Sequence, residues 1–504
     1  YDQSNPLYSV IRGGMVGHTL QAIPTWEQYD ENRTGGYGGL YGDVVNLTHP
    51  LGMVDDNLMK RYSDNVKIFA NAYVSVELMK GLKYKLNLTP DFQFYRYNSY
   101  EGLFDFGLAK HDITAVTEQQ TRTRNILVEN LLTFDRTFGD HKVSALVGYT
   151  YQDSRYRYMQ GSGQGMPTGI TEIDAASQGL AVSGNSSRSV LTSILGRAFY
   201  SYKNRYLLTA TIRRDGSSKF GSNYRYGNFP SVSVGWNIAE EDFVKNSVSW
   251  LDQLKLRGGY GVLGNQEIDN YQYVSVVTTG INYPDGKSGL IQGAFPKTFA
   301  NPDIKWEETA MTNVGIDFMA LRNRLTLTAD WYVKNTKDIL LNVPIPISTG
   351  GANDPIRNAG KIRNQGFEFN LGWNESLNKD LSYGVSFLGT YNKNEVVEMG
   401  AESQVITGGT IHGGTYTSRT LAGYPIGGFW LIPTDGYFNS TEEVQAHQKD
   451  GVLIQPSAEP GDIRFKDTNN DGTINDEDRV YCGSTFTKFN SSNTGTITSK
   501  NVDF

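Results

Sequence analysis

The sequence has very little cysteine, no long apolar run and no excess of positive charge. Cys482 is its one cysteine, which excludes an internal disulfide framework and a multi-cysteine metal cluster. No stretch reaches the roughly eighteen consecutive apolar residues of a membrane-spanning helix, and the first ten residues lack the basic and apolar regions of a secretory signal. The 46 basic and 53 acidic residues leave a net charge of −7, so we expect no nucleic-acid partner.

Enzyme motifs are also scarce. The six histidines are scattered without the spacing of metal ligands. There is no nucleophile elbow or Walker loop, and the glycine-rich stretch from Gly35 to Gly42 lacks the strand-to-helix setting of a phosphate-binding loop. The acidic residues could supply carboxylate pairs, but none stands out as a hydrolase pair. We therefore predict that the protein is not an enzyme.

The sequence is rich in glycine and aromatic residues, and several segments alternate strictly between apolar and polar residues. Its 55 glycines and 31 tyrosines suit turns and sheets better than helices. From Val66 to Leu78 every even position is apolar, and after Lys80 and Gly81 the alternation resumes from Leu82. This period of two on both sides of a tight turn predicts a β-hairpin. Similar hairpins are predicted around Gly139–His141, Lys203–Arg205, Leu321–Arg324 and Asn378–Asp380, and a further strand pair at Ser231–Ala239 and Lys255–Leu263.

Long polar segments separate these hairpins, at Asn98–Gln120, Asp153–Ser189 and Gly264–Glu308. If consecutive strands are antiparallel neighbours, all tight turns fall at one end of the sheet and all long loops at the other. This asymmetry is typical of an outer-membrane β-barrel, with its short periplasmic turns and long extracellular loops. A soluble β-sandwich would alternate in the same way, since one of its faces is buried and the other is wet. The number of long hairpins and the one-sided loops favour the barrel.

One stretch, "DTNNDGTINDEDR" from Asp467 to Arg479, has the spacing of a calcium-binding loop. Glycine occupies the sharp turn at Gly472, and a shorter aspartate stands at the last position, where a bidentate glutamate is usual. An asparagine- and aspartate-rich turn without metal is the alternative. We expect a structural Ca²⁺ here rather than a catalytic ion, and the predicted ligands are Asp467, Asn469, Asp471, Thr473 through its carbonyl, Asn475 and Asp478.

Several long segments resemble the SusC-like TonB-dependent transporters, outer-membrane importers of glycans and peptides in Bacteroidetes-type bacteria. The stretch "RDGSSKFGSNYRYGNFPSVSVGWNIAEEDF" at Arg214–Phe243 is similar to a hallmark segment of that family, and "SNPLYSV" at Ser4–Val10 fits it as well. The other similar segments are Leu254–Tyr273, Asn301–Pro346, Asn358–Phe369, Gly423–Trp430 and Gly461–Ser484.

The resemblance implies an all-β fold, a transmembrane antiparallel barrel of 22 strands that is plugged from the periplasm. It implies energy supplied by TonB through an N-terminal region, a SusD-like lipoprotein as an outer lid, contact with outer-membrane lipid, and an oligosaccharide or peptide substrate. Residues 1–504 are expected to form only part of that barrel, because no plug, TonB box or final strands are recognised. Residues 461–484, which hold the calcium-type loop, are expected to connect barrel strands. The alternative function is a glycan-binding β-protein of the cell surface that transports nothing.

Overall fold

The computed structural model describes residues 27–39, 49–107, 110–284, 286, 289–343, 345, 348, 353–400, 405–410, 416–500 and 502–503. The resemblance at Ser4–Val10 lies outside these residues. The chain divides into two compact units, Tyr1–Leu132 with Gly148–Ser193, and Thr133–Val147 with Ile194–Phe504. Among the described residues, no helix has the length and hydrophobicity needed to cross a membrane.

The first unit is an antiparallel sheet in the order β1-β3-β6-β7-β8, with β2 also paired to β3. The strands β6, β7 and β8 contribute residues to both units. Short 3₁₀ helices lie at Gly52–Val54 and Ile173–Ala175. The strands are β1 (Met59–Phe69), β2 (Ala72–Met79), β3 (Leu82–Glu101), β4 (Phe104–Asp105), β5 (Lys110–His111), β6 (Ala115–Phe138), β7 (His141–Gln164) and β8 (Gln178–Tyr202).

The hairpin predicted from Val66 onward is confirmed, with one interruption. Val66–Leu78 is not one strand, because β1 ends at Phe69 and β2 begins at Ala72, although the register with β3 is the same on both sides of the break. The break faces Pro90, which has no amide hydrogen to donate to the ladder. Gly81 closes the turn at a φ of 86°, a conformation that glycine adopts without a steric penalty.

Buried hydrophobic residues in the first unit form small clusters rather than one large core. Leu58, Phe104 and Phe106 make one cluster, and Tyr100, Val116 and Met166 make another. Both clusters lie where loops and short strands meet the ends of the long strands, so they anchor those loops to the sheet.

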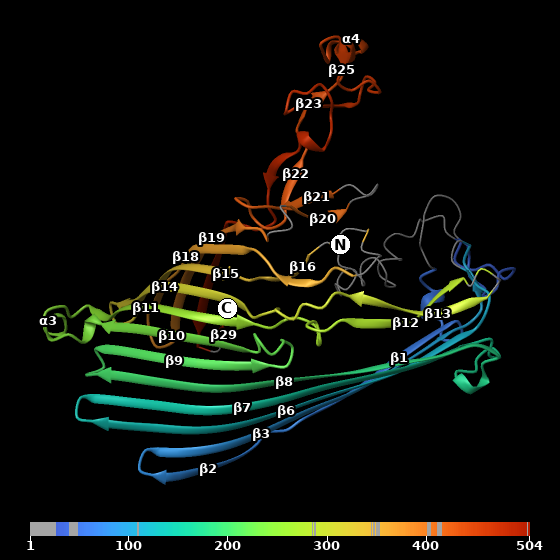
Figure 1. Ribbon diagram of the computed structural model, residues 1–504. Coiled ribbons are helices and arrows are strands. Elements are labelled where there is room, and N and C mark those ends of the chain that lie inside the picture. The colour runs from blue at the N-terminus through green and yellow to red at the C-terminus, as the bar shows by residue number, and fades with distance from the viewer. Residues whose placement is uncertain are drawn as a thin grey trace. The chain divides into compact units, whose positions relative to one another are not determined.

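The second unit contains a longer antiparallel sheet, here called the wall. Its order is β9-β10-β11-β14-β15-β18-β19-β28, and β29 pairs with the end of β28 (Figure 1). The predicted turns at Lys203–Arg205 and Leu321–Arg324 are confirmed by residues with positive φ. The predicted pairing of Ser231–Ala239 with Lys255–Leu263 is confirmed as β10 with β11. The strands are β9 (Tyr206–Ser217), β10 (Tyr226–Asn237), β11 (Leu251–Asn265), β14 (Glu307–Ala320), β15 (Leu325–Lys337), β18 (Lys361–Ser376), β19 (Leu381–Glu398), β28 (Phe489–Ser499) and β29 (Val502–Asp503).

Short elements connect the wall strands at both ends. The 3₁₀ helix Ile238–Glu240 and helix α3 (Asp242–Lys245) join β10 to β11. The opposite ends of the strands carry two hairpins, β12 (Val276–Pro284) with β13 (Leu290–Thr298), and β16 (Leu340–Asn342) with β17 (Ile356–Asn358).

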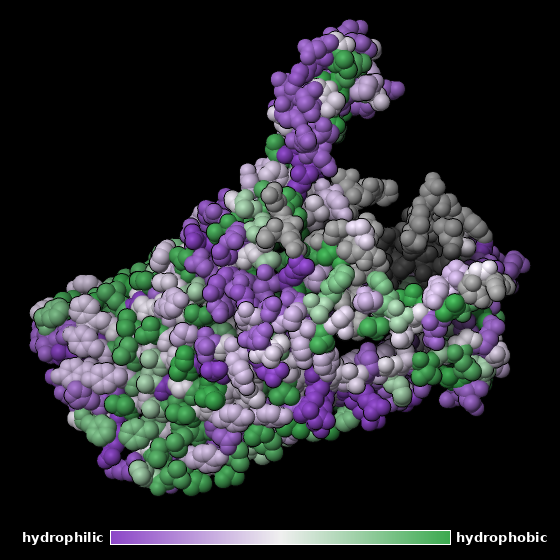
Figure 2. Space-filling view, in the orientation of Figure 1, coloured by the Kyte–Doolittle hydropathy of each residue, from purple (hydrophilic) through white to green (hydrophobic). Residues whose placement is uncertain are grey.

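The described residues among 399–488, between β19 and β28, form a separate small structure that is here called the insertion. In Figure 1 it stands off the ends of β18 and β19, and Figure 2 shows that its outer part is mainly hydrophilic. Its 3₁₀ helix is Asp476–Asp478. Its other elements are β20 (Ile406–Thr410), β21 (Tyr416–Thr420), β22 (Gly428–Leu431), β23 (Thr434–Tyr437), α4 (Thr441–Ala446), β24 (Gln448–Lys449), β25 (Val452–Leu453), β26 (Ile463–Phe465) and β27 (Val480–Gly483).

The wall has an apolar face and a polar face. Strand register aligns one row of side chains across the wall, and most of its members are large, hydrophobic and exposed. A soluble protein would bury such a row, whereas a barrel exposes it to lipid. The row runs through Leu208, Val234, Gly258, Val314, Trp331, Phe367, Tyr391 and Phe489.

The strands extend further than the sequence predicts. The segments expected as loops at Asn98–Gln120 and Asp153–Ser189 contain the ends of β3, β6, β7 and β8, and β7 alone has 24 residues. About ten residues are enough to cross the hydrocarbon layer. Beyond the layer both faces of a strand meet water, so the alternation of apolar and polar residues ends there, although the backbone hydrogen bonds between strands continue. A strand predicted from that alternation is therefore too short.

Candidate functional site

The calcium-type loop lies in the insertion, between β26 and β27, and connects two short strands instead of two helices. Asn470 and Gly472 have φ values of 59° and 92° and turn the backbone back on itself. Asp467 accepts hydrogen bonds from the backbone amides of Asp471 at 3.0 Å and Gly472 at 2.7 Å. The first predicted ligand therefore lies within the turn of the loop.

The loop's side chains converge on Asp471. One of its carboxylate oxygens accepts from the Thr473 hydroxyl at 2.8 Å, and the other from the amides of Asn469 at 3.0 Å and Asn475 at 3.3 Å. The hydrogen bond from Thr473 is the largest cause of a lowered pKa at Asp471. The carboxylate thus stays charged in the folded loop.

The last predicted ligand, Asp478, is fully buried and has a second role. Its two oxygens accept from the backbone amides of Thr468 at 2.7 Å and Asn475 at 2.8 Å, which ties the two ends of the loop together. Arg479, beside it, pairs with Asp476 at 2.6 Å and lowers the pKa of that carboxyl. The structure therefore brings all six predicted ligands into one hydrogen-bonded loop.

The donor set fits a hard cation only in part. Among the described residues, no three His, Cys, Asp or Glu side chains are grouped as metal ligands. The loop would have to supply amide and carbonyl oxygens beside its carboxylates, as calcium loops do. Asn469 and Asn475 now direct their amide nitrogens toward Asp471. The side-chain oxygens of these two asparagines accept from the backbone amides of Asp471 at 3.0 Å and Glu477 at 2.7 Å, so both side chains would have to give up these bonds to present their oxygens to a cation.

The polar face of the wall carries a network of charges that the sequence did not predict. Arg257 on β11 makes paired hydrogen bonds to Asp330 on β15 at 2.6 and 2.7 Å, and contacts Asp317 on β14 at 3.1 Å. Asn313 donates to the same Asp330 at 3.1 Å. Paired bonds between guanidinium and carboxylate are among the stronger hydrogen bonds in proteins.

Gly315 makes this network possible, because the Arg257 side chain passes over it from β11 to β15. A Cβ at this position would lie 2.5 Å from a carboxylate oxygen of Asp330 and 2.7 Å from the guanidinium carbon. One sign of this network is present in the sequence. Asp317 on β14 and Asp330 on β15 interrupt the polar positions of their strands with a charge, on the face opposite the apolar row. Without the register, nothing in the sequence connects these residues to Arg257.

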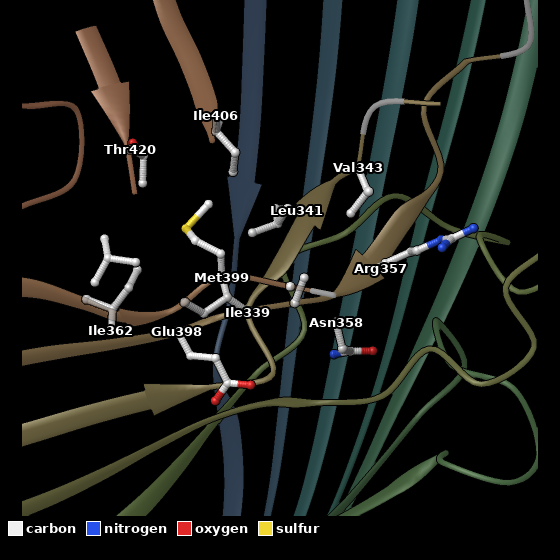
Figure 3. A pocket seen from close by; sticks show the side chains of 14 residues that line it. Ile339, Leu341, Val343, Arg357, Asn358, Ile362, Glu398, Met399, Ile406 and Thr420 are labelled. Carbon is white, nitrogen blue, oxygen red and sulfur yellow. The ribbon is translucent and has the colours of Figure 1, made fainter. Parts of the chain in front are cut away.

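An apolar pocket of about 190 Å³ lies beyond the outer ends of β15, β18 and β19 (Figure 3). Its lining is largely aliphatic, and the described part of it contains no aromatic side chain. Glu398 and Asn358 lie at one edge in Figure 3. The lining side chains used below are Ile339, Leu341, Val343, Ile362, Met399 and Ile406.

Comparison with known proteins decides the family. The profile of the family described as "TonB dependent receptor-like, beta-barrel" matches residues 16–478. The chain belongs to this family. Its fold is accordingly that of a transmembrane antiparallel β-barrel of the outer membrane, and the apolar face of the wall is the face toward lipid.

Among relatives, TonB-dependent receptor P39 of Formosa agariphila is 32% identical over 390 residues, which are 76% of this chain and 36% of that protein. TonB-dependent receptor SusC of Bacteroides thetaiotaomicron is 34% identical over 58% of this chain and 28% of that protein. These relatives are named as receptors, and not as enzymes. The structure of the RagAB peptide transporter matches with a TM-score of 0.79 at 21% identity, over 94% of this chain and 51% of that one. The chain spans about half of these proteins or less.

Proposed function

We propose that the protein to which this chain belongs imports oligosaccharides or peptides across the outer membrane, in a TonB-dependent manner and together with a SusD-like lipoprotein. The main support for the proposal is that the wall has one apolar and one polar face, in a chain that belongs to this family. An apolar face suits lipid, and a polar face with an Arg257–Asp330 network suits the interior of a transport barrel.

The pocket beyond β15, β18 and β19 favours a peptide over an oligosaccharide. Sugar rings pack on aromatic faces, whereas aliphatic side chains such as Leu341 and Met399 suit an apolar peptide side chain. The volume of about 190 Å³ is of the right order for one such side chain. The structurally similar RagAB complex is a peptide transporter, which agrees with this preference.

The test is uptake by cells that carry the full-length gene. We expect labelled oligopeptides to enter cells with the gene, and entry to be lost when the proton-motive force is dissipated or when the lipoprotein gene is deleted. Leu341→Trp, which fills the pocket, should weaken uptake of peptides with aliphatic residues while leaving the protein in the membrane. Binding of ligand at the cell surface without TonB-dependent entry would contradict transport and support the non-transporting alternative.

We also propose that Asp467, Asn469, Asp471, Thr473, Asn475 and Asp478 bind a structural Ca²⁺ that rigidifies the loop. The spacing of oxygen-bearing residues and the turn at Gly472 support this. Chelation should raise protease cleavage within the insertion of the full-length protein, and Asp471→Ala should abolish the response while the barrel stays folded. The control is Glu459→Gln, which alters an exposed carboxylate of the insertion outside the calcium-type loop. Unchanged protease sensitivity after chelation would contradict calcium binding.

A further inference from the structure

Three arginines surround one buried aspartate in the first unit. The carboxylate of Asp153 on β7 lies 2.9 Å from Arg188 on β8, 3.2 Å from Arg155 on β7 and 3.6 Å from Arg124 on β6. The side chain of Asp153 is only 9% exposed, whereas those of the three arginines are 37–48% exposed. These four side chains together carry a net charge of +2, and the three arginines are partly exposed.

The cluster lies on the lipid side of the sheet. Asp153 continues the odd-numbered row of β7 that includes Tyr149 and Tyr151, and Arg188 also reaches the Tyr151 hydroxyl at 3.5 Å. On β6, Arg124 is followed at alternate positions by Ile126 and Val128. Asp153 and Arg124 thus lie at the end of the apolar row of their strands, where a barrel surface leaves the hydrocarbon layer.

Distance along the strand places the cluster at the outer boundary of the membrane. Asp153 lies twelve residues beyond His141, the first residue of β7, which follows the short turn at Gly139 and Asp140. At roughly 3.3 Å per residue and a tilt of about 45°, this corresponds to a height of about 28 Å. The apolar band of such barrels is about 25 Å tall, so the arginines lie at the level of the lipid headgroups.

One nitrogen–hydrogen donor of the cluster makes no hydrogen bond among the described residues. The Nε of Arg124 is buried and has no hydrogen-bond partner among the described residues. Arg188 engages Asp153 through both Nε at 3.1 Å and Nη2 at 2.9 Å, so that pair alone can neutralise the aspartate. Arg155 shares the same carboxylate through Nε at 3.3 Å and Nη2 at 3.2 Å, so three guanidinium groups compete for one carboxylate. The exposed parts of the Arg124 and Arg155 side chains can donate to an anion with several oxygen atoms.

We propose that Arg124, Arg155 and Arg188, seated on Asp153, bind a phosphate group of the anionic glycolipid in the outer leaflet. Planar guanidinium groups match phosphate oxygens in paired hydrogen bonds, and the adjacent tyrosines would lie along the start of the acyl chains. The inference rests on the outer-membrane location of the barrel and not on its transport activity. Asp153 holds the three arginines in place, while the lipid supplies the missing negative charge.

The test compares full-length protein purified in detergent and transferred to nanodiscs with either phosphorylated lipid A or the same lipid A without phosphates. Native mass spectrometry counts the lipid that stays bound. Arg124→Gln/Arg155→Gln removes the two excess charges and leaves the Asp153–Arg188 pair intact. We expect about tenfold weaker retention of the phosphorylated lipid in this variant, which corresponds to about 1.4 kcal/mol of binding free energy.

The matched control is Arg136→Gln/Lys203→Gln, which removes two charges near the short-turn ends of β6 and β8 and should leave retention unchanged. Equal retention by the cluster variant and the unmodified protein would overturn the proposal. So would equal binding of both lipids to the unmodified protein, a comparison that stays decisive if the variant fails to fold. Displacement of the lipid by inorganic phosphate at the same concentration would also count against a lipid site.

Discussion

The wall strands of the second unit and the insertion between β19 and β28 are stabilised in different ways. Wall strands of 11 to 18 residues pair edge to edge, and most of their large hydrophobic side chains remain exposed. The strands of the insertion have only two to five residues, but it buries Phe438, Val444 and Asp478. The wall therefore depends on lipid as its apolar solvent, whereas the insertion is a small water-soluble fold with its own core.

The largest effect is expected from removing that core. Phe438 is 1% exposed and packs against His447, with ring centroids 5.5 Å apart. Phe438→Ala should cost the insertion about 3–5 kcal/mol, since a large cavity replaces the ring. Hydrogen exchange of the full-length protein should then show lost protection in residues 434–466, while heat-modifiable gel mobility of the barrel stays normal.

The matched control is Phe486→Ala, because Phe486 is 45% exposed and should lose little. If Phe438→Ala removed both the heat-dependent gel shift of the barrel and the protection of the insertion, the two regions would fold as one cooperative unit.

The wall is tested by placing a charge on its lipid face. Val314 lies at the middle of the apolar row and is 54% exposed. Val314→Arg should destabilise the barrel in lipid vesicles by about 2–4 kcal/mol, because a guanidinium would enter hydrocarbon. The measurement is a denaturant titration of the full-length protein in vesicles.

The control is Thr328→Arg, on the polar face of the neighbouring strand β15. If both variants lost equal stability, the assignment of lipid-facing and interior faces would be wrong.

The network on the polar face gives a smaller effect. Arg257→Gln leaves Asp317 and Asp330 without their shared cation, and a loss of about 1–3 kcal/mol in thermal or chemical stability is expected. Lys393→Gln removes an exposed partner of Glu395 and should cost less than about 1 kcal/mol. Gly315→Ala should resemble Arg257→Gln, because the added methyl group displaces the guanidinium. A neutral Gly315→Ala variant would contradict the crossing described for Arg257.

These regions also differ in how far the sequence predicts them. Alternation between Val66 and Leu88 reveals a hairpin because one physical rule, apolar toward lipid, repeats at every second residue. The calcium-type loop is local, so its spacing was recognisable from Asp467 to Asp478 alone. The Arg257 network and the Asp153 cluster join separate strands. Their contacts depend on the register between neighbouring strands, and local sequence patterns give no information about that register.

The smallest effect is a pH dependence confined to the loop of the insertion. Hydrogen bonds from Thr473 and Asn469 lower the pKa of Asp471 below its ordinary value of 3.8. Such a group contributes stability above its unfolded pKa, and the contribution is lost as the pH falls through the lower folded pKa. Hydrogen exchange in residues 467–478, corrected for its intrinsic pH dependence, should therefore stay constant from neutral pH to about pH 4 and rise only below it. Asp471→Asn should reduce this acid step and leave the part due to Asp476, whose pKa is lowered by Arg479, and the wall strands of the same sample serve as an internal reference. An acid step of unchanged size in Asp471→Asn would assign the titration to another carboxylate of the loop.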